Sequence, residues 1–205
     1  MNKNSNTYII IYSTVMVVVV ALVLAFASLS LQGRQNANEE NEMKGALLSS
    51  IGVNIVPEKG ADKTQFINDQ YDKYIKNGFA VKEDGSVVDG ANAFDILKNL
   101  KSEYDKPASE RELPVFESVD EQGVVKYIIP VRGSGLWGAI WGYVALNEDW
   151  NTISGVVFDH ASETPGLGAE IATPIFENQF IDKQLYSGTQ LVGISVVTGT
   201  AGNNP

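Results

Sequence analysis

The 205-residue sequence contains no cysteine and only one histidine, His160. Without cysteine the chain can form no disulfide, perform no thiol catalysis and ligate no iron–sulfur cluster. One histidine is too few for a histidine-rich metal site. His160 has no evident nucleophile partner either, so we assign it no catalytic role. We expect no catalytic residue and no metal site, and any redox chemistry must come from an organic cofactor.

Positive charge is scarce, because 15 lysine and arginine residues face 25 aspartate and glutamate residues, which gives a net charge of −10. Lys3 is the only charged residue before position 32, so the rest of the chain is even more acidic than the whole. Such a surface repels nucleic acids and anionic lipid headgroups. We therefore expect no nucleic-acid partner.

No charged residue occurs from Tyr8 to Leu31. This run exceeds the roughly 20 residues with which a helix crosses a bilayer, so it predicts a single transmembrane anchor. The alternative is a cleaved signal peptide, because Lys3 precedes the run and Ala25-Phe26-Ala27 loosely resembles a cleavage site. Either interpretation exports the rest of the chain. An ion pathway through this helix is not expected, since the run holds no ionisable group except tyrosine.

The sequence divides into a cytoplasmic N-terminus with the anchor (1–31), a helical connector (32–60) and a folded domain (61–205). Apolar periodicity predicts helices at 32–54, 62–77, 93–104 and 169–180, the last weakened by Pro174. Strands are predicted at 79–82, 86–88, 113–119, 124–131, 140–146, 153–158 and 191–197. Antiparallel hairpins with flanking helices indicate an α+β domain.

One glycine-containing segment, Arg132 to Gly138, lies between two predicted strands, and its glycines bracket Trp137. Glycine permits close backbone approach, and tryptophan offers a flat apolar face to a ligand. The alternative is a buried tryptophan that closes a corner of the sheet.

A second segment runs from His160 to Glu170, between a predicted strand and a predicted helix. Backbone N–H groups at such a helix start suit a phosphate or a polar heterocycle. Glu163 and Thr164 add an acceptor and a hydroxyl that suit the edge of a flavin ring. The alternative is a Pro-Gly turn in which threonine and glutamate cap the helix.

The run Glu163-Thr164-Pro165-Gly166-Leu167-Gly168, preceded by Gly135-Leu136-Trp137, resembles the C subunit of the Na⁺-translocating NADH:quinone reductase. The order of anchor, helical segment, hairpins and the two motifs matches over nearly the whole chain. The six-residue motif is also shared by the G subunit of the Rnf complex. The segment from Asn147 to Ile153 favours the sodium pump.

The resemblance implies a protein of the bacterial inner membrane with one helix and a periplasmic FMN-binding domain. Its FMN would be joined through its phosphate to a threonine by a flavin-attaching enzyme. Together with other membrane subunits it would pass electrons from NADH toward ubiquinone while the complex moves Na⁺. The residues expected to contact FMN are Trp137, Glu163, Thr164, Gly166, Leu167 and Gly168.

In this family the attachment threonine lies in a Ser-Gly-Ala-Thr motif, which this sequence lacks. We expect that the chain is truncated before it, and Thr189 in Ser187-Gly188-Thr189 is a weak substitute. Two alternative functions remain open. One is an Rnf-type electron-transport subunit, and the other is an exported assembly or binding protein without a redox role.

Overall fold

The computed structural model of the protein describes residues 6–196. The chain divides into two compact units after Glu42. The first unit contains most of α1 (Asn6–Ser50), a helix that is long and apolar enough to cross a membrane. Large apolar side chains from Ile9 to Leu31 are exposed on it. The Ser13 hydroxyl donates to the carbonyl of Ile9 at 2.8 Å, so its polarity is satisfied within the helix, as a lipid environment requires.

The last turns of α1 belong to the second unit, where Leu47 and Leu48 are fully buried. The helix ends in a Schellman motif. The N–H of Gly52 donates to Ser49 and that of Val53 donates to Leu48, both at 3.0 Å, and Gly52 has a φ of 84°. The predicted 32–54 helix is therefore continuous with the anchor and ends at Ser50.

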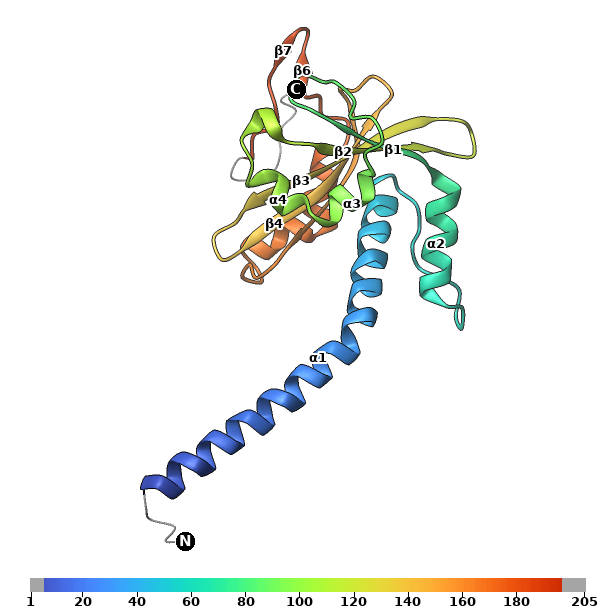
Figure 1. The fold of residues 1–205 in the computed structure, drawn as a ribbon. Helices are drawn as coiled ribbons and strands as arrows, with labels where there is room; N and C mark the ends of the chain where they lie inside the picture. The colour runs from blue at the N-terminus through green and yellow to red at the C-terminus, as the bar shows by residue number, and fades with distance from the viewer. Residues whose placement is uncertain (1–5, 197–205) are drawn as a thin grey trace. The chain divides into compact units, whose positions relative to one another are not determined.

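A five-stranded antiparallel sheet forms the centre of the second unit, with its strands in chain order (Figure 1). Its strands are β1 (Ile75–Val81), β2 (Leu113–Val119), β3 (Val125–Ser134), β4 (Ala139–Asn147) and β5 (Ile153–His160). This arrangement confirms the predicted α+β class, and the strands predicted at 113–119 and 124–131 form the β2–β3 hairpin.

Both faces of β4 are covered. Successive side chains of a strand point to opposite sides of the sheet, and those of β4 pack into two different clusters. Tyr143 and Ala145 join the main core with Leu47, whereas Leu146 joins a second cluster on the other side. The main core is completed by α3 (Ala93–Lys98) and α4 (Leu100–Tyr104). Helix α2 (Lys63–Tyr74) packs Tyr71 against this core, and the 3₁₀ turn η1 (Ala108–Glu110) lies outside it. The predicted 93–104 helix is therefore two short helices that meet at Asn99.

The predicted 62–77 helix is too long. It ends at Tyr74, and Ile75 already has an extended backbone and pairs with Ser118. Gly78 lies inside β1, where an added Cβ would lie 3.0 Å from the Cβ of Ala93. Tertiary pairing thus overrides the helical periodicity of this segment.

The predicted hairpin of 79–82 and 86–88 is present only as a turn and an isolated bridge between Val81 and Val87. The N–H of Lys82 donates to Ser86 at 2.9 Å, and Gly85 has a φ of 80°. The main partner of β1 is β2, so most of its hydrogen bonds go to a strand that is distant in sequence.

No single helix covers 169–180. The segment forms three short turns: η2 (Gly168–Ala172), α5 (Pro174–Glu177) and η3 (Asn178–Phe180). Thr173 is extended and Pro174 starts a new turn, because proline lacks the N–H that would continue the earlier one.

The predicted 191–197 strand is also wrong in its bounds. A small hairpin of β6 (Tyr186–Ser187) and β7 (Gln190–Leu191) takes its place, residues 192–196 have no regular structure, and Val197 lies outside the described residues.

Candidate functional site

The first of the two glycine segments forms the loop between β3 and β4. Ser134, the last residue of β3, pairs with Ala139, the first residue of β4. The four residues between them, Gly135 to Gly138, are closed by a hydrogen bond from the N–H of Gly135 to the carbonyl of Gly138 at 2.7 Å. We call these four residues the tryptophan loop.

The second segment, which we call the glutamate loop, comprises residues 161–170 and follows β5. Because β4 and β5 are antiparallel neighbours, the end of β5 lies beside the start of β4. The N–H of Ala161 donates to Ala139 at 2.9 Å, and the hydroxyl of Ser162 donates to the carbonyl of Trp137 at 2.8 Å. The register of the sheet therefore brings the two loops together.

Glu163 joins the two loops through its side chain, and the residue is only 8% exposed. Its Oε1 accepts the N–H of Trp137 at 2.9 Å and that of Gly138 at 3.3 Å. A Cβ at Gly135 would overlap Oε1, and a Cβ at Gly168 would lie 2.5 Å from Oε2. Both loops need glycine at the points where they enclose this carboxyl group.

Three apolar side chains of the two loops point away from the core. Leu136 is 83% exposed, Trp137 is 67% exposed and Leu167 is 73% exposed. The alternative of a buried tryptophan at a sheet corner is therefore wrong. Large apolar side chains held outward by a firmly bonded backbone are typical of a surface that contacts a ligand or partner.

The backbone N–H groups of the glutamate loop are mostly used within the loop. Those of Leu167 and Ala169 donate to the carbonyl of Thr164, both at 3.1 Å, and that of Gly166 donates to Oε1 of Glu170 at the same distance. The expectation of open N–H groups at the start of a long helix is wrong, because only a short 3₁₀ turn follows. The loop presents apolar side chains rather than a row of donors.

The structure brings together all six residues predicted to contact a cofactor, five on the glutamate loop and Trp137 on the tryptophan loop. The side chain of Thr164 is exposed, and Gly166 has a φ of 75°. His160 accepts the N–H of Glu163 on its Nδ1 at 3.3 Å. The sequence reasoning did not find Ser162 or the packing of Gly135 on Glu163. The glycines on both sides of Trp137 were the sequence signal that could have predicted this close packing.

Thr189 lies elsewhere, in the exposed turn between β6 and β7. This hairpin is held at Asn151, whose Oδ1 accepts the N–H of Tyr186 at 2.7 Å. Asn151 is in the turn between β4 and β5, at the end opposite the tryptophan loop. With roughly 3.3 Å per residue, the nine residues of β4 separate the two ends by about 26 Å. The anchor point of the Thr189 hairpin is therefore far from the six predicted residues.

Comparison with known proteins identifies the family of this chain. The model of the FMN-binding domain family matches residues 135–201, a segment that begins at the tryptophan loop. The C subunit of the Na(+)-translocating NADH-quinone reductase of Vibrio anguillarum is 30% identical over 198 residues, which cover 89% of this chain and 74% of that protein. This chain belongs to the family of that C subunit.

Solved structures of the same family agree with the fold. The crystal structure of the Parabacteroides distasonis protein aligns with a TM-score of 0.69 at 36% identity, covering 82% of this chain and 77% of that one. That of Shewanella oneidensis NqrC gives a TM-score of 0.59 at 28% identity, covering 80% and 81%. The family membership predicted from the two motifs is confirmed, and so is an FMN-binding domain.

Proposed function

We propose that this chain is a membrane-anchored flavoprotein subunit that relays electrons through FMN in a Na⁺-pumping NADH:ubiquinone reductase. The observation that carries the proposal is the pairing of the tryptophan and glutamate loops at the start of the FMN-binding domain match. The relatives described above are named as subunits of the Na⁺-translocating enzyme, which favours it over an Rnf-type complex. Other membrane subunits of that reductase would be its partners.

The exposed surface fits the ring system of FMN better than its phosphate. Leu136, Trp137 and Leu167 offer apolar area, whereas the nearby N–H groups of Trp137 and Leu167 are already bonded. Flavin supplies reversible electron transfer when bound, and the protein tunes it through packing and hydrogen bonds. In this proposal the three apolar side chains hold the ring and exclude water from it. The exposed Thr164 hydroxyl is our side-chain candidate for a polar contact at the ring edge.

The phosphate would be tied elsewhere, through a phosphoester to a threonine, as the family resemblance implies. Thr189 is a poor site for that bond, because its hairpin is anchored at the opposite end of β4 and β5. One FMN attached there would have to lie away from Trp137 and Leu167. We therefore propose that the flavin-attaching enzyme acts on a different threonine. Flavin that stays with the mature protein after denaturation would support covalent attachment.

Truncation of the apolar contacts tests the ring site. We expect Trp137→Ala and Leu167→Ala each to weaken the binding of free FMN about tenfold, the effect of losing roughly 1.4 kcal/mol of contact energy. Ile175→Ala is the matched control, because Ile175 is 82% exposed but lies on α5, outside the two loops. The measurement is a titration of the detergent-purified chain followed by flavin fluorescence.

Equal FMN affinities of the unmodified chain and the three variants would place the flavin elsewhere. No FMN binding by the unmodified chain would instead favour an exported assembly or binding protein without a redox role.

A further inference from the structure

The buried side chain of Glu163 is held by the protein through one of its carboxyl oxygens. Its Oε1 accepts two backbone N–H groups of the tryptophan loop, and its Oε2 faces Gly168 of its own loop. At 8% exposure the residue offers little surface to a ligand, in contrast to Trp137 and Leu167. A direct role of Oε1 at the edge of a cofactor would require it to leave both donors.

We propose that Glu163 is a positioning residue: its carboxyl group fixes the tryptophan loop against the glutamate loop and so sets where the Trp137 and Leu167 side chains lie. Hydrogen bonds from two successive N–H groups to one carboxyl oxygen orient the backbone on which Trp137 stands. The identity of the bound ring rests on the proposed function, but the positioning itself does not.

The surrounding residues support this role. The hydroxyl of Ser162 holds the carbonyl of Trp137, so both backbone polar groups of that residue are bonded by side chains of the glutamate loop. His160 accepts the N–H of Glu163 and thereby holds the backbone from which the carboxyl group extends. Gly135 leaves the space that the carboxyl group fills.

Three variants separate positioning from a direct charge effect. Glu163→Ala removes the acceptor of both N–H groups, whereas Glu163→Gln keeps an amide oxygen that can accept the same two N–H groups. Gly135→Ala keeps the glutamate at position 163 but puts a methyl group where its Oε1 lies, so the carboxyl group must move. Gly133→Ala is the matched control at the end of β3, because its Cβ would meet only Ile140 at an ordinary 3.5 Å.

The first readout is hydrogen exchange of the full chain, followed by mass spectrometry on peptides that cover the tryptophan loop and β2. We expect Glu163→Ala and Gly135→Ala to speed exchange at Trp137 and Gly138 about tenfold, with β2 unchanged, because each loses acceptor bonds at those two amides. Glu163→Gln and Gly133→Ala should keep most of the protection. A general loss of stability would instead speed exchange in both peptides.

The second readout is the affinity for free FMN. We expect Glu163→Ala to bind about as weakly as Trp137→Ala, and Glu163→Gln to bind nearly as well as the unmodified chain. If Glu163→Ala and Gly135→Ala leave exchange at Trp137 and Gly138 unchanged, the positioning role is overturned. It is also overturned if Glu163→Gln loses FMN as fully as Glu163→Ala while exchange stays slow, which would indicate direct contact through charge.

Failure of the proposed function gives a different pattern from failure of the positioning role. If the proposed function fails, neither the unmodified chain nor any variant binds FMN. Faster exchange in Glu163→Ala and Gly135→Ala would still show that the carboxyl group orders the tryptophan loop. Should Glu163→Ala fail to fold, Gly135→Ala against Gly133→Ala carries the same comparison.

Discussion

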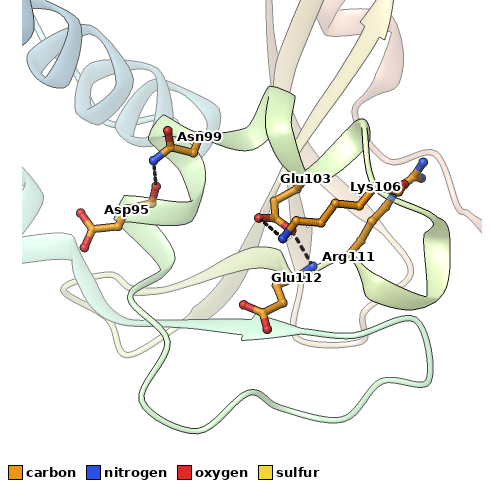
Figure 2. Close-up of polar contacts among 6 residues, drawn as sticks. All are labelled: Asp95, Asn99, Glu103, Lys106, Arg111 and Glu112. Atoms are coloured by element: carbon orange, nitrogen blue, oxygen red, sulfur yellow. Dashed lines mark hydrogen bonds and ion pairs between the residues drawn. The ribbon is translucent and has the colours of Figure 1, made fainter.

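Among residues 6–196, Glu103 and Glu163 are the charged side chains that the fold buries. Glu163 is satisfied by two backbone N–H groups, whereas Glu103 has a lysine partner. Lys106 Nζ lies 2.8 Å from both carboxyl oxygens of Glu103, and the N–H of Glu112 donates to one of them at 3.1 Å (Figure 2). Arg111 completes this corner by donating to the carbonyls of Tyr104 and Lys106. The cluster ties α4 to the start of β2.

The pKa of Glu103 is lowered from its ordinary value of 4.5. Desolvation by burial is the largest single influence and raises this pKa, but the hydrogen bonds from Lys106 and Glu112 and the positive charge of Lys106 together outweigh it. A carboxyl group with a lowered pKa in the folded state stabilises the fold above the unfolded pKa. That stability is lost as the pH falls through the lower, folded pKa.

We therefore expect Glu103→Gln to reduce the free energy of unfolding by about 1–2 kcal/mol at pH 7, since it weakens hydrogen bonds to a charged group. The difference should shrink as the pH falls below about 4.5, where the unfolded chain begins to bind a proton at this residue, and it should vanish below the lower, folded pKa. Urea unfolding from pH 7 to pH 3 measures it. Glu83→Gln, at an exposed turn, is the control. A pH-independent difference would mean that shape rather than charge matters at Glu103.

Elements with strong local signals are those that the sequence predicts well. The β2–β3 hairpin has alternating apolar residues on both sides of a turn in which Gly123 has a φ of 83°. The 169–180 segment fails because its apolar periodicity is cut at Thr173 and Pro174. Helix α2 ends early because Ile75 pairs with a residue more than forty positions away, at Ser118, which no local pattern records.

The candidate site was predicted in its residues but not in its connections. Trp137 and Leu167 were named from their chemistry and their family motifs. The bonds of Glu163 to the tryptophan loop depend on the register between β4 and β5, which includes an irregularity at Ala145 and Leu146. Register over a whole hairpin is a tertiary property, so the two loops could not be paired from their own residues.

The end of α1 packs against β5 at a point where only glycine fits. A Cβ at Gly155 would overlap the carbonyl oxygen of Ser50, which is backbone and cannot rotate away. Gly45, one and a half turns earlier on α1, has room, because its Cβ would lie 3.6 Å from Ile55. Gly155 therefore tests the contact between helix and sheet, and Gly45 is the control on the same helix.

We expect Gly155→Ala to lower the free energy of unfolding by about 2–3 kcal/mol, because the helix end must shift away from the sheet. Gly45→Ala should change it by less than about 1 kcal/mol and in the stabilising direction, since alanine favours the helix. Thermal unfolding followed by circular dichroism compares the two. Equal losses in both variants would show that the helix end is not seated on Gly155.

The whole molecule combines an apolar helix with an acidic folded unit. Side chains from Ile9 to Leu31 are exposed and uncharged, while residues 32–205 carry a net charge of −11, which is −10 − 1 because Lys3 is the only earlier charge. Exposed apolar area of this size is stable in lipid, not in water. We propose that α1 spans the bacterial inner membrane once and that the acidic unit lies on the periplasmic side.

The absence of cysteine makes this orientation directly measurable, since each introduced cysteine is the only thiol. We expect Ser86→Cys, in an exposed turn of the folded unit, to react with a membrane-impermeant maleimide in intact spheroplasts. Asn6→Cys, at the first residue of α1, should react only after the membrane is permeabilised. The reverse pattern would place the folded unit in the cytoplasm. Reaction of both sites in intact spheroplasts, with the chain released into the soluble fraction, would mean that the N-terminal helix does not anchor it.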